Sequence, residues 1–174
     1  MSSTGSTRGN PSMGDILRSM FVIAVVLLAL WGIGQFFTSE PETPVKTVDY
    51  ARVVEQARPA ADFPLAAPPS LPEGWKATSA RFQPDAWHLG VLTDNEEYIG
   101  LEQVTTSVSS AIERFAKDSQ PQGEAEVAGQ TWERRKGPDD RLTYVRREGE
   151  LTTLVDGTAS RSVIEDYIAS LSTS

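Results

Sequence analysis

The sequence predicts an α+β fold: one N-terminal transmembrane helix, followed by an antiparallel sheet packed with two or more helices. Three observations lead to this prediction. A long apolar run without charge lies near the N-terminus. Behind it, segments rich in β-branched and aromatic residues are separated by short polar turns, which favour antiparallel pairing. Two further segments carry apolar residues at helical spacing, so helices are expected to pack on the sheet.

Residues 19–37 form the predicted transmembrane helix. No charged residue occurs from Ser19 to Phe37, and a core helix would show a polar face that this run lacks. As a helix, Met20–Phe37 would span roughly 27 Å, close to the thickness of the hydrocarbon core of a bilayer. The alternative is a cleaved signal peptide, but Gln35–Glu40 offers no small-residue cut site.

Charges around this run predict its orientation. Arg8 and Arg18 precede it, and Glu40 and Glu42 follow it. The positive-inside rule then makes 1–18 a cytoplasmic tail and sends everything after the helix outside. We expect a single-pass protein of the cell membrane, held in the lipid bilayer by the N-terminal helix, with an extracytoplasmic C-terminal domain.

Residues 38–70 are predicted to be a linker. A short helix is expected over Asp49–Arg58, where apolar residues recur at helical spacing. Five prolines between Pro59 and Pro72 forbid regular helix and favour an extended lead-in. The α+β domain is therefore assigned to 71–174.

Seven segments of this domain have the pattern of strands. They are Trp75–Phe82, Trp87–Thr93, Tyr98–Thr106, Glu124–Val127, Gln130–Lys136, Arg141–Arg147 and Leu151–Val155. In the first of them, alternation places Trp75, Ala77, Ser79 and Arg81 on one side.

Two helices complete the predicted domain. The first covers Ser109–Asp118, where Ser110 and Glu113 have the spacing of a capping box. The second follows Ser162 and Glu165, which repeat that spacing, and its apolar face is Val163, Ile164, Tyr167, Ile168 and Leu171.

Composition excludes several functions. The chain of 174 residues contains no cysteine, which removes disulfides, thiol catalysis and cysteine-bound metals. Its formal net charge is −8, and an acidic domain repels phosphate polymers, so no nucleic acid partner is expected. We also expect no cofactor and no metal site.

Four segments resemble a known family. They are Leu71–Trp75, Trp87–Thr93, Tyr98–Gln103 and Leu154–Ala159. Their order behind one apolar N-terminal run resembles the actinobacterial single-pass membrane-anchored proteins whose outer domain has no known function. The resemblance implies a location in the actinobacterial cell envelope, and it implies no reaction and no catalytic residue.

The sequence offers no catalytic signature. His88 is the only histidine, and alternation places it opposite Trp87 and Leu89, which makes it a surface residue if that face is solvated. A serine triad with an aspartate has no Gly-x-Ser-x-Gly elbow to hold the nucleophile. The acidic turns Asp94–Glu97 and Asp139–Asp140 lack the pattern of an EF-hand, so they are interpreted as solvated turns. No residue is therefore predicted to be catalytic, and the protein is not expected to be an enzyme.

One basic cluster is the candidate binding surface of an otherwise acidic domain. Pairing across the Gly137–Asp140 turn would gather six cations on one hairpin: Arg134, Arg135, Lys136, Arg141, Arg146 and Arg147. Such a surface could dock an acidic partner, an anionic polymer or lipid headgroups. The alternative is that Glu133, Glu148 and Glu150 pair with these cations on a solvated face.

These observations predict a membrane-anchored extracytoplasmic module of the cell envelope that binds or supports another envelope or membrane protein without catalysis. A domain that binds a small molecule or glycan is the first alternative, and a hydrolase is the second.

Overall fold

The computed structural model describes residues 14, 17–18, 20–28 and 46–173. The chain divides into two compact units, Met1–Pro44 and Val45–Ser174. Every strand that the structure describes belongs to the second unit.

The predicted transmembrane helix over 19–37 is wrong. In the described parts of the chain, no helix is both long enough and apolar enough to cross a bilayer. The continuous helical stretch described in that range is 20–28, whereas a spanning helix needs about 20 apolar residues. The single-pass localisation in the cell membrane depended on this helix and is wrong with it. Residues 19 and 29–37 of the predicted helix lie outside the described residues.

An antiparallel sheet with helices packed on it forms the second unit, as the strand pattern predicts. Its seven strands are β2 (Lys76–Gln83), β3 (Ala86–Leu92), β4 (Tyr98–Val104), β5 (Gln120–Val127), β6 (Gln130–Lys136), β7 (Leu142–Glu148) and β8 (Leu151–Gly157). The order across the sheet is β2-β3-β4-β8-β7-β6-β5, so two meanders meet where β4 pairs with β8. A separate ladder joins β1 (Ala66–Ala67) to β9 (Ser172–Thr173).

Helices α2 and α3 begin at side chains that cap their free backbone N–H groups. Helix α2 (Tyr50–Ala57) follows Asp49, whose carboxylate accepts from the N–H of Arg52. Helix α3 (Val108–Phe115) is capped by Ser107 rather than by the predicted Ser110. Helix α4 is Arg161–Ser170, and short 3₁₀ turns occur as η1 (Arg58–Ala60) and η2 (Pro138–Asp140).

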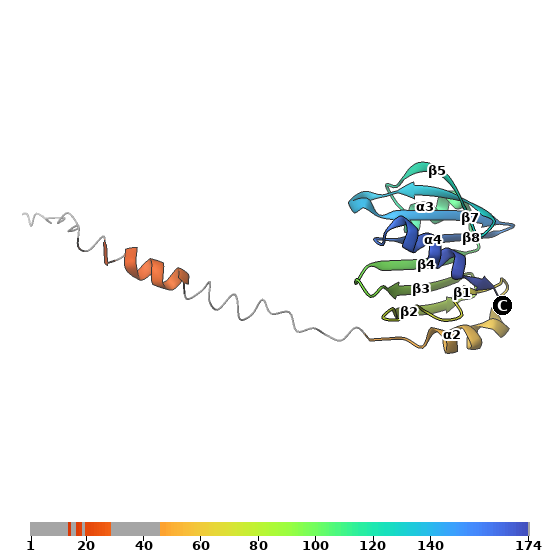
Figure 1. The fold of residues 1–174 in the computed structure, drawn as a ribbon, viewed down its shortest axis with the longest axis horizontal. Helices are drawn as coiled ribbons and strands as arrows, with labels where there is room; N and C mark the ends of the chain where they lie inside the picture. The colour runs from red at the N-terminus through yellow and green to blue at the C-terminus, as the bar shows by residue number, and fades with distance from the viewer. Residues whose placement is uncertain (1–13, 15–16, 19, 29–45, 174) are drawn as a thin grey trace, which may run out of the picture. The chain divides into compact units, whose positions relative to one another are not determined.

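Helices α3 and α4 lie on opposite faces of the sheet, which are called here the α3 face and the α4 face (Figure 1). The α4 face carries the larger core. It buries large side chains of the sheet against α4, namely Trp87, Leu89, Val91, Ile99, Leu101, Tyr144 and Val155 against Ile164, Tyr167 and Ile168. Phe63 and Leu65, from the segment predicted to be a linker, are buried in the same core.

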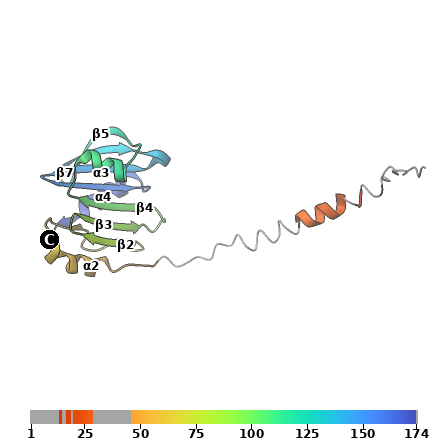
Figure 2. The same cartoon turned by 180° about the vertical axis from the view of Figure 1, so that it is seen from behind.

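Helix α3 covers only part of the other face (Figure 2). Its Ala111 packs with Val104, Val145 and Leu154 in a second, smaller core. The apolar cover therefore lies toward β7 and β8, and the part of the α3 face over β2, β3 and β4 is left to polar side chains.

Candidate functional site

Polar side chains fill the part of the α3 face that lies over β2, β3 and β4. Two rows of residues cross these strands in register. The first row is Arg81, His88 and Glu102, and the second is Ser79, Gly90, Gly100 and Asp156. Because residues opposite one another on neighbouring strands share a face, both rows lie on the same side of the sheet.

A β-bulge in β2 places Ser79 in this group. Ala77 pairs with Val91, yet Ser79 pairs with Gly90, so Thr78 is an extra residue in β2. The bulge reverses the alternation beyond Ala77, which faces the opposite core. The sequence-based expectation that Ala77 and Ser79 share one side of the strand is therefore wrong. The Thr78 hydroxyl donates to the carbonyl oxygen of Gly90 at 3.2 Å and ties the bulge to β3.

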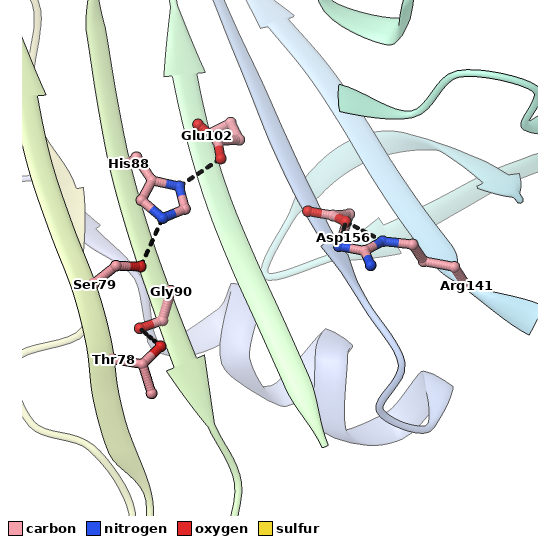
Figure 3. Close-up of polar contacts among 7 residues, drawn as sticks. All are labelled: Thr78, Ser79, His88, Gly90, Glu102, Arg141 and Asp156. Atoms are coloured by element: carbon pink, nitrogen blue, oxygen red, sulfur yellow. Dashed lines mark hydrogen bonds and ion pairs between the residues drawn. The ribbon is translucent and has the colours of Figure 1, made fainter. Parts of the chain in front are cut away.

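Ser79, His88 and Glu102 form one hydrogen-bonded line across three strands (Figure 3). The Ser79 Oγ lies 2.8 Å from Nε2 of His88, and Nδ1 of His88 lies 2.5 Å from Oε1 of Glu102. A carboxylate can only accept, so Nδ1 of the imidazole donates to Glu102. In the neutral imidazole, Nε2 then carries a lone pair and accepts from the Ser79 hydroxyl.

Two glycines leave room above β3 and β4 for the Tyr98 ring. A Cβ on Gly90 would lie 2.5 Å from Ser79 Oγ and 3.0 Å from the Tyr98 hydroxyl oxygen. A Cβ on Gly100 would lie 2.9 Å from both the Tyr98 hydroxyl and Asp156 Oδ1. The Tyr98 hydroxyl thus lies close to the same point above Gly90 as the serine oxygen.

Tyr98 is held in its protonated form. Burial is the main cause that raises its pKa, and the carboxylates of Asp156 and Glu102 raise it further, while Arg141 and Arg81 lower it. Among the described residues its hydroxyl makes no hydrogen bond, so it is free to donate to a molecule bound on this face.

Asp156 is a buried carboxylate at the β4–β8 junction and is 4% exposed. Arg141 forms an ion pair with it (Figure 3). The Arg141 guanidinium also lies 5.5 Å from the centre of the Tyr98 ring. Burial raises the pKa of Asp156, and the arginine opposes that shift. This pair closes the polar row on the side toward β7.

A hollow of about 300 Å³ opens between the first row and the end of α3. Its lining includes the polar side chains of Arg81, His88, Glu102 and Arg114, with Ala86 and Phe115 as an apolar wall. The guanidinium of Arg114 lies 4.8 Å from the centre of the Phe115 ring. In the described part of the chain, the side chains of Arg81 and Arg114 make no hydrogen bond and no ion pair. Two guanidinium groups without an ion-pair partner among the described residues therefore line one hollow of an acidic protein.

The structure does not leave the six predicted cations of the basic hairpin free. Four of them form ion pairs, in which Arg135 pairs with Glu133, Lys136 with Asp140, Arg141 with Asp156 and Arg146 with Glu148. The other two donate to backbone carbonyls, Arg134 to Gln122 and Arg147 to Gly149 and Thr106. Alternation also sends Arg134 and Arg135 to opposite faces of β6.

His88 lies opposite the buried Trp87 and Leu89, as alternation predicts. Its side chain is only 20% exposed, and both ring nitrogens are hydrogen-bonded. The acidic turns are mostly exposed, and the described residues contain no group of three or more side chains suited to hold a metal ion. Ser79 and Glu102 were not singled out from the sequence, since their meeting with His88 depends on strand pairing and on the bulge.

Comparison with known proteins gives a family without an assigned function. No curated protein and no solved structure matches the chain. A family model matches residues 8–171, nearly the whole chain. The resemblance to an uncharacterised family is thereby confirmed, while the actinobacterial source it implies stays a prediction. The chain belongs to the family described as "Protein of unknown function (DUF4245)".

Proposed function

We propose that this domain is a binding module that takes a small anionic ligand, a carboxylate or a phosphate, in the hollow between β2, β3, β4 and α3. The observation that carries the proposal is the pair Arg81 and Arg114, whose guanidinium groups line one hollow and form no ion pair in the described part of the chain. Guanidinium groups bind carboxylate and phosphate through paired N–H donors.

Glu102 offsets only one of these two cations, so the three side chains leave a net positive charge in the hollow. Its carboxylate accepts from His88 Nδ1 at 2.5 Å and forms no ion pair with either arginine in the described part of the chain. Phe115 and Ala86 add an apolar wall, so the hollow suits an anion that carries a short apolar part. Its volume of about 300 Å³ lies at the lower end of ligand pockets, which favours a small molecule over a polymer.

Two larger hollows support the proposal less well. One, of about 360 Å³, is lined by Leu71, Trp75 and Tyr167 and holds no cation. The other, of about 380 Å³, contains Arg146, which already pairs with Glu148 at 2.7 Å. Among the described residues, neither hollow offers an unpaired cation that would select an anionic ligand.

The alternative function is docking of an acidic partner protein on the basic hairpin. It has less support, because each of the six cations already bonds to a carboxylate or to a backbone carbonyl. A partner would have to compete with those bonds, whereas a ligand at Arg81 and Arg114 competes with no ion pair in the described part of the chain.

Thermal unfolding in the presence of inorganic phosphate and a series of small carboxylates tests the proposal. A ligand that binds only the folded chain stabilises it by about 2.7 kcal/mol at a hundred times its Kd, so Tm should rise by several degrees. The double variant Arg81→Gln, Arg114→Gln should lose this rise, while Arg52→Gln, on the exposed surface of α2, should keep it. Equal rises in all three proteins, or no rise with any anion, would contradict the proposal.

A further inference from the structure

We propose that Ser79 is a nucleophile toward acyl donors, with His88 as its general base and Glu102 as the residue that positions His88. The line formed by the serine oxygen, the imidazole and the carboxylate has the connectivity that serine hydrolases use, with Nε2 toward the serine and Nδ1 toward the acid. Serine hydroxyls are weak nucleophiles unless a base takes their proton, and such a base lies 2.8 Å away here.

Two features of the backbone place Ser79 for this role. The bulge at Thr78 turns Ser79 onto the face of His88, and β-bulges commonly redirect a side chain next to an active site. Gly90, directly opposite, has no Cβ, and one placed there would lie 2.5 Å from Ser79 Oγ. The hydroxyl keeps its position only because β3 has a glycine at this point.

The Tyr98 hydroxyl supplies a donor for developing negative charge. It lies close to the same point above Gly90 as Ser79 Oγ, and its raised pKa keeps it protonated. Such a donor stabilises the oxyanion that forms when an oxygen attacks an acyl carbon. The Tyr98 hydroxyl is therefore assigned as the donor to that oxyanion.

The reaction can be written with all atoms accounted for. Ser79 Oγ forms a bond to the acyl carbon of an ester while its proton moves to His88 Nε2. The bond between the acyl carbon and the ester oxygen then breaks, and the leaving oxygen takes the proton from Nε2. Water next attacks the acyl-serine, loses a proton to Nε2 and releases the acid, and Ser79 recovers its proton. The net change is hydrolysis of the ester.

This inference goes beyond anion binding and does not require it, since no step uses Arg81 or Arg114. It runs against the expectation from the sequence that the protein is not an enzyme. Because the two proposals use different side chains, either one can fail while the other stands. An acyl donor that also carries a carboxylate or phosphate would satisfy both.

Labelling of the full chain with a neutral fluorophosphonate tests the inference, because only an activated serine displaces the fluoride. Intact mass should show one adduct, and peptide mapping should place it on Ser79. Ser79→Ala and His88→Gln should abolish the adduct, while Ser162→Ala, which removes an exposed serine of α4, should keep it. Wild-type protein unfolded in urea should not label. An unlabelled folded chain, or an adduct on another serine, would overturn the inference.

Glu102→Gln tests the positioning role. The amide can donate to Nδ1 and so favour the wrong imidazole tautomer, which should slow labelling by about 10²–10⁴-fold. Tm should stay within a few degrees of the wild type, because the glutamine has the same size. Labelling at the wild-type rate would remove Glu102 from the proposed site.

Discussion

The substitution Gly90→Ala should lower the reactivity of Ser79 while it leaves the free energy of unfolding nearly unchanged. The added methyl group would lie 2.5 Å from Ser79 Oγ and 3.0 Å from the Tyr98 hydroxyl oxygen. Ordinary contact begins at 3.4 Å, so the serine oxygen has to move by about 0.9 Å. Rotation of Ser79 to another staggered position relieves the closest contact without moving β2. The Tyr98 ring, with its hydroxyl at 3.0 Å and a ring carbon at 3.2 Å, has to shift by only a few tenths of an ångström.

The stability cost of this change should be small. Rotation of Ser79 breaks one hydrogen bond, the 2.8 Å bond to His88, and a typical hydrogen bond contributes about 0.5–1.5 kcal/mol. Alanine in a strand offsets part of this, since glycine costs roughly 0.5–1 kcal/mol through its greater freedom in the unfolded chain. The net change in the free energy of unfolding should therefore stay within about 1 kcal/mol.

The loss of reactivity should be large by contrast. Without its base, Ser79 should label about 10²–10⁴-fold more slowly. The rate of fluorophosphonate labelling and urea unfolding measure the two quantities on the same preparation, with Gly137→Ala as the control because its Cβ would meet only atoms at 3.7 Å or beyond. Labelling at the wild-type rate would refute the role of the bond from Ser79 to His88. A loss of more than about 3 kcal/mol would refute the idea that side-chain rotation relieves the contact.

Three further changes test the packing and the buried ionisable groups. Gly157→Ala places a Cβ 2.4 Å from the backbone oxygen of Tyr98, so β4 and β8 must separate, and urea unfolding should show a loss of about 3 kcal/mol or more that Gly137→Ala does not show. Tyr144→Phe removes a 2.8 Å bond to α4 and should cost about 1 kcal/mol near pH 8. Burial, and then that hydrogen bond, raise the pKa of Tyr144 to about 12. The folded chain thus keeps a proton that the unfolded chain loses above about pH 10, so the advantage of wild type over Tyr144→Phe should shrink between those values, and a constant difference would contradict this. Asp156→Asn should gain stability relative to wild type at neutral pH and none near pH 3, because burial raises the pKa of Asp156 in the folded state, and a gain independent of pH would contradict this cause.

The antiparallel sheet could be predicted because its information is local. Alternating apolar residues and short polar turns mark the strands, and β6 begins and ends at the predicted residues, Gln130 and Lys136. The order across the sheet could not be predicted, since the pairing of β4 with β8 joins segments far apart in the chain. The membrane prediction rested on hydropathy, which reports the composition of a segment, whereas no helix in the described residues is both long enough and apolar enough to cross a bilayer.

The candidate site was less accessible to prediction from the sequence. The alternation of side chains along a strand placed His88 on the correct face. Its hydrogen-bond partners, Ser79 and Glu102, come from two other strands, and their positions depend on the register of the sheet. Ser79 reaches the face of His88 only because of the bulge at Thr78, and no residue type in the sequence predicts a bulge there. One available indication was that His88 and Glu102 both lie in segments on which the family resemblance rests.

Mapping of backbone amide NMR shifts during titration with inorganic phosphate, or with the carboxylate that stabilises the chain most, tests the central claim most directly. The amides that move should cluster around Arg81 in β2, His88 in β3 and Arg114 in α3, and these shifts should vanish in the Arg81→Gln, Arg114→Gln variant. Shifts confined to the β6–β7 hairpin would place anion binding on the basic cluster instead. That result, or the absence of any saturable shift, would contradict the proposed site.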